Sequence, residues 1–285
     1  MINTAVFSPT FPHALHRRVR VLALALTCGL AGVAGDAAAQ GDEITPICTD
    51  RPTKANATCT VPAGAWQLES DVGSYTRDTQ PGTRTETFNW VNPTFKYGLN
   101  EHMDLQLNAS PQLRVRSTDR ATGRRETVNG AGDVTLRLKA RFHAGERVSV
   151  AVIPFVKAPT ARQGIGNDEW EGGVALPISI ALPKRLSLTF GPEVDLLADS
   201  DGSGHHPAII NLVNLARPVS QRATLAVELW SSINADPART IEQYSADIAL
   251  SYLVTPVLQL DMGANFGLND TTPDAQVYVG FAQRF

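Results

Sequence analysis

The last twelve residues of the chain, DAQVYVGFAQRF at positions 274–285, alternate along an extended backbone. One side of such a strand carries Val277, Val279, Phe281 and Phe285, and the other carries Tyr278, Gly280, Ala282 and Arg284. Soluble domains usually finish in a polar, frayed tail. We therefore expect the chain to end in a structured strand whose terminal Phe285 has a use.

The same two-residue period continues back to Gly64. Met103, Leu105 and Leu107, for example, alternate with Asp104, Gln106 and Asn108. No segment has the pattern of a helix, so the fold class is all-β. Twelve strands are expected, at about 65–76, 85–97, 102–116, 132–142, 147–158, 169–182, 185–197, 207–217, 221–233, 241–254, 256–268 and 274–285.

The connections between these strands alternate in length. Long polar loops fall at 77–84, 117–131, 159–168, 198–206, 234–240 and 269–273, whereas the turns at 183–184, 218–220 and 255 are short. Short periplasmic turns, longer external loops and an even strand number are typical of outer-membrane barrels. The chain is therefore predicted to form a closed antiparallel transmembrane β-barrel. Periodicity alone leaves a secreted β-sandwich open.

A final strand that ends in Phe285 resembles the C-terminal signal by which bacterial outer-membrane barrels are recognised for insertion. Gln283 departs from the apolar residue usual at that place. Phe285 is thus a candidate assembly signal, and the barrel-assembly machinery is an expected partner. The last strand must pair with the first, because an open edge in lipid would leave backbone groups unpaired.

The N-terminus has the order of a secretory signal peptide, predicted over residues 1–39. Basic residues at 16–20 precede an apolar stretch at 21–35 and three alanines at 37–39. Without residues 1–39 the chain keeps 22 basic and 27 acidic residues, a net charge of −5 that argues against nucleic acid. We expect a periplasmic lead-in at 40–63 and a barrel at 64–285, surrounded by outer-membrane lipid and lipopolysaccharide.

Two cysteines remain after the signal peptide, Cys48 and Cys59, in ICTDRPTKANATCTVPAG at 47–64. An oxidising periplasm favours joining them as a disulfide. A bridge around about a dozen residues contributes roughly 3 kcal/mol in the chain-entropy model. A metal pair is the alternative, although no His lies near. The expected role is structural, holding the Pro-rich lead-in against the barrel.

Blocks of the sequence resemble, in order, those of an outer-membrane family labelled "putative meta-pathway of phenol degradation", often called simply "transporter". They are CTDRP at 48–52, VPAGAWQLES at 61–70, YGLNEHMDLQL at 97–107, GAGDVTLRLKARF at 130–142, FVKAPTA at 155–161, SYLVTPVLQLDMGANFGLN at 251–269 and PDAQVYVGFAQRF at 273–285. The resemblance implies a barrel with a role in uptake of aromatic or other small compounds. It brings no catalytic residues to carry over.

Barrel enzymes such as outer-membrane phospholipases are the first competitor. GSGHH at 202–206 brings Ser203 near His205 and His206, but no G-x-S-x-G motif is present. A Gly-rich loop tip is also a poor place to hold a catalytic triad. The acidic runs at 168–171 and 199–204 lack the spacing of a calcium loop. We expect no catalytic residue, no metal site and no cofactor.

Charges on the polar faces of the strands are the candidate lumen lining. They are Arg114, Arg116, Arg137, Lys139, Arg141, Glu193, Asp195, Glu228, Asp247 and Asp261. In a ring of twelve strands the basic group would face the acidic group. Such walls can sort permeating solutes, or the charges can pair and fill the lumen. The sequence thus predicts passive transport of small-molecule solutes, aromatic ones among them; the alternative is a non-conducting barrel with a structural, adhesive or lipid-directed, phospholipase-like role.

Overall fold

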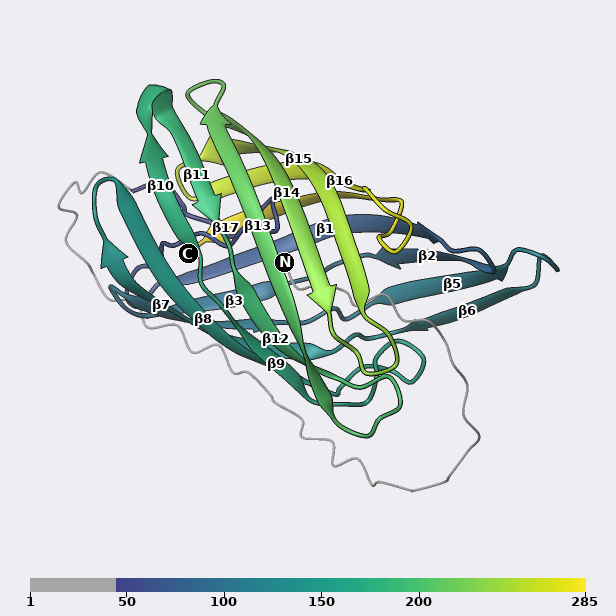
Figure 1. The fold of residues 1–285 in the computed structure, drawn as a ribbon. Coiled ribbons are helices and arrows are strands. Elements are labelled where there is room, and N and C mark those ends of the chain that lie inside the picture. The colour runs from purple at the N-terminus through teal and green to yellow at the C-terminus, as the bar shows by residue number, and fades with distance from the viewer. Residues whose placement is uncertain (1–44) are drawn as a thin grey trace, which may run out of the picture.

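The computed structural model describes residues 45–285, which form a closed antiparallel barrel of twelve strands, as predicted (Figure 1). Seven of the twelve are continuous: β1 (Trp66–Thr79), β8 (Val148–Ala158), β13 (His205–Pro218), β14 (Ala223–Asn234), β15 (Ile241–Thr255), β16 (Leu258–Gly267) and β17 (Ala275–Arg284). Pairing of β17 with β1, from Gln67 opposite Arg284 to Arg77 opposite Ala275, closes the ring. The predicted signal peptide lies outside the described residues.

The other five strands are each broken into two segments. They are β2 (Thr83–Asn89) with β3 (Thr94–Asn100), β4 (Met103–Asn108) with β5 (Leu113–Asp119), β6 (Arg125–Gly130) with β7 (Val134–Ala144), β9 (Glu171–Ala175) with β10 (Ile178–Leu182), and β11 (Leu186–Phe190) with β12 (Glu193–Ala198). Four breaks contain a proline, namely Pro93, Pro111, Pro177 and Pro192. Proline has no N–H to give to the ladder, so the pairing is interrupted there.

The barrel is polar inside and apolar outside. Among the described residues, 32 buried side chains are polar or charged and 14 are hydrophobic. Large apolar side chains such as Leu229 and Met262 are more than half exposed on the outer surface. This is the inverse of a water-soluble sandwich and the arrangement of a barrel that faces lipid.

Helical structure in residues 45–285 is limited to one 3₁₀ turn, η1 (Pro183–Arg185), in a short connection. No helix in this part of the chain is long and apolar enough to cross a membrane.

The predicted external loop at 117–131 is wrong, because most of it is strand. β5 runs on to Asp119 and pairs with β6. Together with β2 and the end of β1, these strands project past one end of the barrel (Figure 1). Both faces of these strands are mostly polar, so the sequence there has no alternation of apolar and polar residues that would predict a strand.

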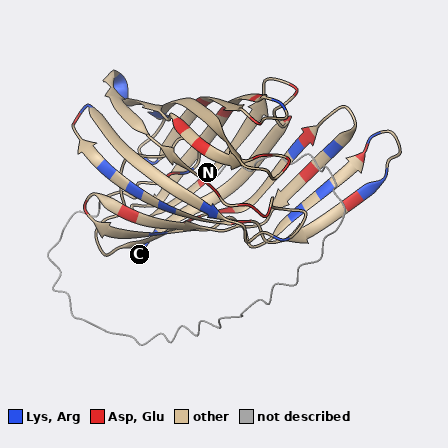
Figure 2. Cartoon of the chain, turned by 60° about the horizontal axis from the view of Figure 1, so that its bottom comes forward, with Lys and Arg blue, Asp and Glu red and all other residues tan. Residues whose placement is uncertain are grey.

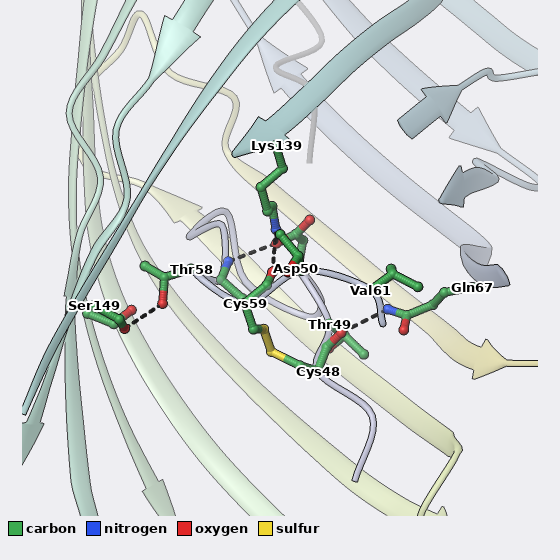
Figure 3. The surroundings of a disulfide bond; sticks show 12 residues. Cys48, Thr49, Asp50, Thr58, Cys59, Val61, Gln67, Lys139 and Ser149 are labelled. Carbon is green, nitrogen blue, oxygen red and sulfur yellow. Dashed lines mark hydrogen bonds and ion pairs between the residues drawn. A yellow bond between two sulfur atoms is a disulfide. The ribbon is translucent and has the colours of Figure 1, made fainter. Parts of the chain in front are cut away.

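The segment before β1 turns into the barrel interior. The rim that carries the short turns is the periplasmic one in barrels of this class. There the Ile47 amide donates to the Pro256 carbonyl over 2.6 Å. The Thr60 hydroxyl donates to the Glu101 carbonyl, also at the rim, over 3.1 Å. Residues 48–59, which we call the inner loop, lie between these points and reach up between the strands (Figure 3).

Candidate functional site

A disulfide closes the base of the inner loop. It joins Cys48 to Cys59, as predicted (Figure 3). The sequence predicts a lead-in held against the barrel, and the structure places its residues 48–59 inside the lumen, in contact with strands around the ring. The side-chain amide of Gln67 on β1 donates to the Cys48 carbonyl over 2.8 Å, and the Thr58 and Ser149 hydroxyls are 2.7 Å apart. Both ends of the loop are therefore fixed to the wall.

Asp50 is the centre of the contact between the inner loop and the basic wall. Its carboxylate accepts hydrogen bonds from Lys96 on β3 and Lys139 on β7, each over 2.5 Å. Lys96 also lies 2.6 Å from Glu69 on β1. Burial alone would raise the pKa of Asp50, but the ammonium groups of Lys139 and Lys96 hold it well below its usual range. Asp50 is thus an anion shared by two buried cations.

Arg51 and Lys54 contact the acidic wall on the other side. The Arg51 guanidinium is 2.6 Å from Asp71 and 2.7 Å from Asp261. Lys54 is ion-paired with Asp247. The Glu228 carboxylate also accepts hydrogen bonds from the backbone amides of residues 54 and 55, over 3.1 and 3.0 Å. The inner loop therefore presents Asp50 to the basic wall and Arg51 and Lys54 to the acidic wall, and it forms ion pairs with both.

Gly280 on β17 makes room for Arg51. A Cβ added there would lie 2.0 Å from Arg51 Nη2. That distance is far inside van der Waals contact, so a larger residue would displace the guanidinium. The wall is shaped around the inner loop as well as charged to match it.

Eight of the ten predicted lumen residues lie on the inward face. Arg137 donates to the Asn56 side chain of the inner loop over 2.6 Å, and Arg141 donates to the Glu101 carbonyl at the rim over 2.8 Å. Inward orientation follows from alternation with exposed apolar neighbours along each strand. The eight are Arg137, Lys139, Arg141, Glu193, Asp195, Glu228, Asp247 and Asp261.

Arg114 and Arg116 do not line the lumen, which corrects the prediction. Asn108 on β4 is buried, but the four-residue break with Pro111 shifts the period, so that Leu113 on β5 is the next inward residue. Arg114 lies opposite Phe88 and Arg116 opposite Glu86, on the outward face. A two-residue period continued across this break places Arg114 and Arg116 on the inward face, which is the wrong one.

The external half of the lumen holds a cavity of about 220 Å³ above the inner loop. Thirteen of its 24 lining residues carry uncharged hydroxyl or amide groups: Ser74, Thr76, Thr87, Asn89, Asn92, Asn108, Ser110, Thr135, Gln243, Ser245, Asn265, Thr272 and Gln276. Sequence reasoning, which followed charges, missed this set.

Every charged residue that lines the cavity has a charged partner. Asp71 is bound to Arg51, and Lys54 to Asp247. Lys157 lies 3.1 Å from Asp133 and 2.7 Å from Glu171. The indole of Trp230 adds the one aromatic surface in the lining, with the Lys54 ammonium 5.2 Å from its ring centroid. The cavity therefore offers neutral hydrogen-bonding groups and a ring rather than free charge.

The histidines of the external loop do not form a catalytic triad. His206 Nδ1 is 2.8 Å from Asp199 Oδ1, and His205 Nε2 is 2.7 Å from the Trp170 carbonyl. The Ser203 backbone amide donates to the Asp201 carboxylate over 2.9 Å, and no hydrogen bond in the described chain joins Ser203 to either histidine. Residues 45–285 also hold no cluster of three or more His, Cys, Asp or Glu side chains that could bind a metal.

The end of the chain is joined to the first strand. The Phe285 amide donates to the Trp66 carbonyl over 2.8 Å, and its side chain is 74% exposed on the outside of the barrel. This geometry extends the closure of the barrel to its last residue.

The fold and the lumen define an outer-membrane β-barrel. The chain belongs to the family described as "Putative MetA-pathway of phenol degradation", whose model matches residues 49–285. That range includes the inner loop from its second residue onward.

Two solved structures with a similar fold are a channel and a porin. The COG4313 outer membrane channel from Pseudomonas putida F1 is 15% identical, with a TM-score of 0.62 over 80% of this chain and 98% of that one. The NanC porin is 11% identical, with a TM-score of 0.51 over 76% and 98%. The comparison with curated proteins gave no match. At these identities the likeness concerns the fold.

Proposed function

We propose that the protein is a passive outer-membrane channel, without enzymatic activity, for small uncharged compounds, aromatic ones among them. The cavity of about 220 Å³ inside the closed barrel carries this proposal. A solute can gather there from the outside, between walls that exclude lipid. Membership of a family named for phenol degradation agrees with it.

The lining of the cavity suggests the chemistry of the solute. Hydroxyl and amide side chains can donate to and accept from a solute of no net charge. Their buried polar atoms include Asn89 Oδ1 and Thr135 Oγ1, which have no protein partner in the described chain. Trp230 offers a face on which a ring can stack. A compound that combines a ring with hydroxyl groups matches both features.

The inner loop is the barrier on this route. A second cavity of only about 20 Å³ lies beside Asp50, Lys96 and Arg137. That space holds about one water molecule. We infer that a solute passes the periplasmic half only when the inner loop shifts, so the protein conducts slowly or intermittently.

Liposome swelling tests the proposal with solutes that do not cross lipid unaided. Phenyl glucoside, an uncharged ring-bearing glycoside, should enter faster than the charged hydroxybenzoate ion. Trp230→Ala should slow phenyl glucoside more than a disaccharide of similar size. Leu229→Ala, which changes the next residue on the outward face, is the matched control. Equal swelling for liposomes with and without the protein would refute transport.

The filled periplasmic half also favours a second candidate, a non-conducting barrel with a structural, adhesive or lipid-directed role. In that case the inner loop would be a permanent plug. Planar-bilayer conductance separates the two, because a plug gives no channel openings under any condition that leaves the barrel folded.

A further inference from the structure

The outward face of the projecting strands carries a cluster of arginines. Directly opposed residues of antiparallel strands share a face. Arg77 on β1 lies opposite Glu86 on β2, and Glu86 lies opposite Arg116 on β5. The same registers place the remaining members on that face. We call the set the arginine patch: Arg77, Arg84, Arg114, Arg116 and Arg125.

The arginine patch is strongly and locally positive. Glu86 is the only carboxylate that shares its face within the paired segments of β1, β2, β5 and β6, so the net charge there is +4. Arg77, Arg114 and Arg125 are exposed, and Arg84 and Arg116 are partly exposed. Figure 2 shows basic residues on the strands that project past the end of the barrel. None of the five arginines has a carboxylate within ion-pair distance in the described chain.

The arginine patch lies at the external edge of the apolar band that surrounds the barrel. On the outward face of the second barrel strand, apolar side chains run from Leu99 up to Phe88, and charged residues begin at Glu86. Eleven residue-to-residue steps at about 3.4 Å each span about 37 Å along the strand. A tilt of about 45° reduces this to about 26 Å of membrane depth, close to the roughly 25 Å apolar band of such barrels.

Aromatic side chains mark the same boundary. Phe88 and Trp90 pack edge to face with ring centroids 4.2 Å apart. Trp90 is 43% exposed on the outer surface. Such aromatic side chains lie at the membrane–water interface. The arginine patch therefore lies at the level of the headgroups of the outer leaflet.

We propose that the arginine patch binds the phosphate groups of lipopolysaccharide in the outer leaflet. A guanidinium pairs with phosphate through two parallel hydrogen bonds, and several guanidinium groups on one rigid sheet can hold a bisphosphorylated headgroup. The acyl chains of the same lipid would lie along the apolar surface below Phe88. The site is on the outside of the barrel and is independent of the lumen.

Binding of bisphosphorylated lipid A to the folded barrel in detergent, measured by native mass spectrometry, tests this assignment. Arg114→Ser with Arg116→Ser should weaken binding at least tenfold. A second pair, Arg84→Ser with Arg125→Ser, should do the same. The matched control is Arg217→Ser with Arg222→Ser, which removes two exposed arginines at the periplasmic end. The control should bind like the unaltered protein, and heat-modifiable mobility should show that all variants fold.

The outcomes that would overturn the proposal are distinct. Equal binding by the patch variants and the control would mean that the arginine patch is not the site. Equal binding of lipid A without phosphates would mean that acyl chains alone are recognised. Competition by inorganic phosphate at concentrations comparable to the lipid would mean a free-phosphate site rather than a lipid site.

Discussion

Replacing Asp50 with Asn should release the inner loop from the barrel. Asp50 accepts hydrogen bonds from Lys96 and Lys139, both almost fully buried. When the Asp50 charge is removed, Lys96 still has the Glu69 carboxylate at 2.6 Å. Lys139 keeps the Cys59 carbonyl at 3.4 Å, and the amide that replaces the Asp50 carboxylate has one acceptor oxygen where Lys96 and Lys139 used two. Lys139 would then have no ion pair, and the buried Asp104 carboxylate, opposite it on β4, would be its remaining counter-charge.

The size of the effect follows from the loss of the buried ion pair between Asp50 and Lys139. Removing one partner of a buried ion pair typically costs about 3–5 kcal/mol. The inserted loop can avoid this cost by leaving the lumen, which hydrates Lys139. Since about 1.4 kcal/mol is a factor of ten, the released population should rise roughly a hundred- to a few-thousandfold. Adding Lys139→Met to Asp50→Asn should reverse most of this rise.

Trypsin cleavage after Lys54 measures the released population. Lys54 is ion-paired within the barrel, and its peptide bond is accessible only when the loop is out. When opening and closing are fast, cleavage tracks the equilibrium population of the open form. Glu126→Gln is the control, because its ion pair with Arg124 is exposed and contributes at most about 1 kcal/mol. Equal cleavage of Asp50→Asn and the unaltered protein would refute the reasoning.

Three further predictions concern the disulfide, the last residue and the basic side chains of β7. Cys48→Ser with Cys59→Ser removes a constraint of roughly 3 kcal/mol and should raise cleavage after Lys54 in mass spectra; unchanged cleavage would mean that the loop does not depend on the bridge. Deleting Phe285 should lower the heat-modifiable, membrane-inserted fraction far more than the exported amount, and an unchanged barrel yield would contradict this. Arg137→Ser with Lys139→Ser should lower the urea midpoint of unfolding, since Asn56 loses its Arg137 donor and Asp50 loses one of its two lysine donors; a reversal-potential shift without destabilisation would mean that these side chains line an open path instead.

Much of the barrel could be predicted from the sequence because lipid and an aqueous lumen impose a strict two-residue period. That period located twelve strands and the inward face of β7, with Arg137 and Lys139. It failed at the break before Leu113, where Pro111 changed the register. A local break of this kind leaves no periodic trace, so Arg114 and Arg116 were assigned to the wrong face.

The inner loop was only partly foreseeable. Cys48 and Cys59 indicated a closed loop, and opposed lumen charges required partners. That these partners are Asp50, Arg51 and Lys54 depends on tertiary contacts across 20 to 210 residues of sequence. The cavity was not predicted, because its hydroxyl and amide groups come from many strands and share no local motif.

Single-channel conductance tests the central claim, that the inner loop controls the only path through the described barrel. The comparison is between the unaltered protein and a variant with Asp50→Asn, Cys48→Ser and Cys59→Ser, each checked for trypsin cleavage after Lys54. We expect small or rare openings for the unaltered protein and larger, longer ones for the variant. A variant that is cleaved after Lys54, remains a folded barrel and yet conducts no better than the unaltered protein would contradict it.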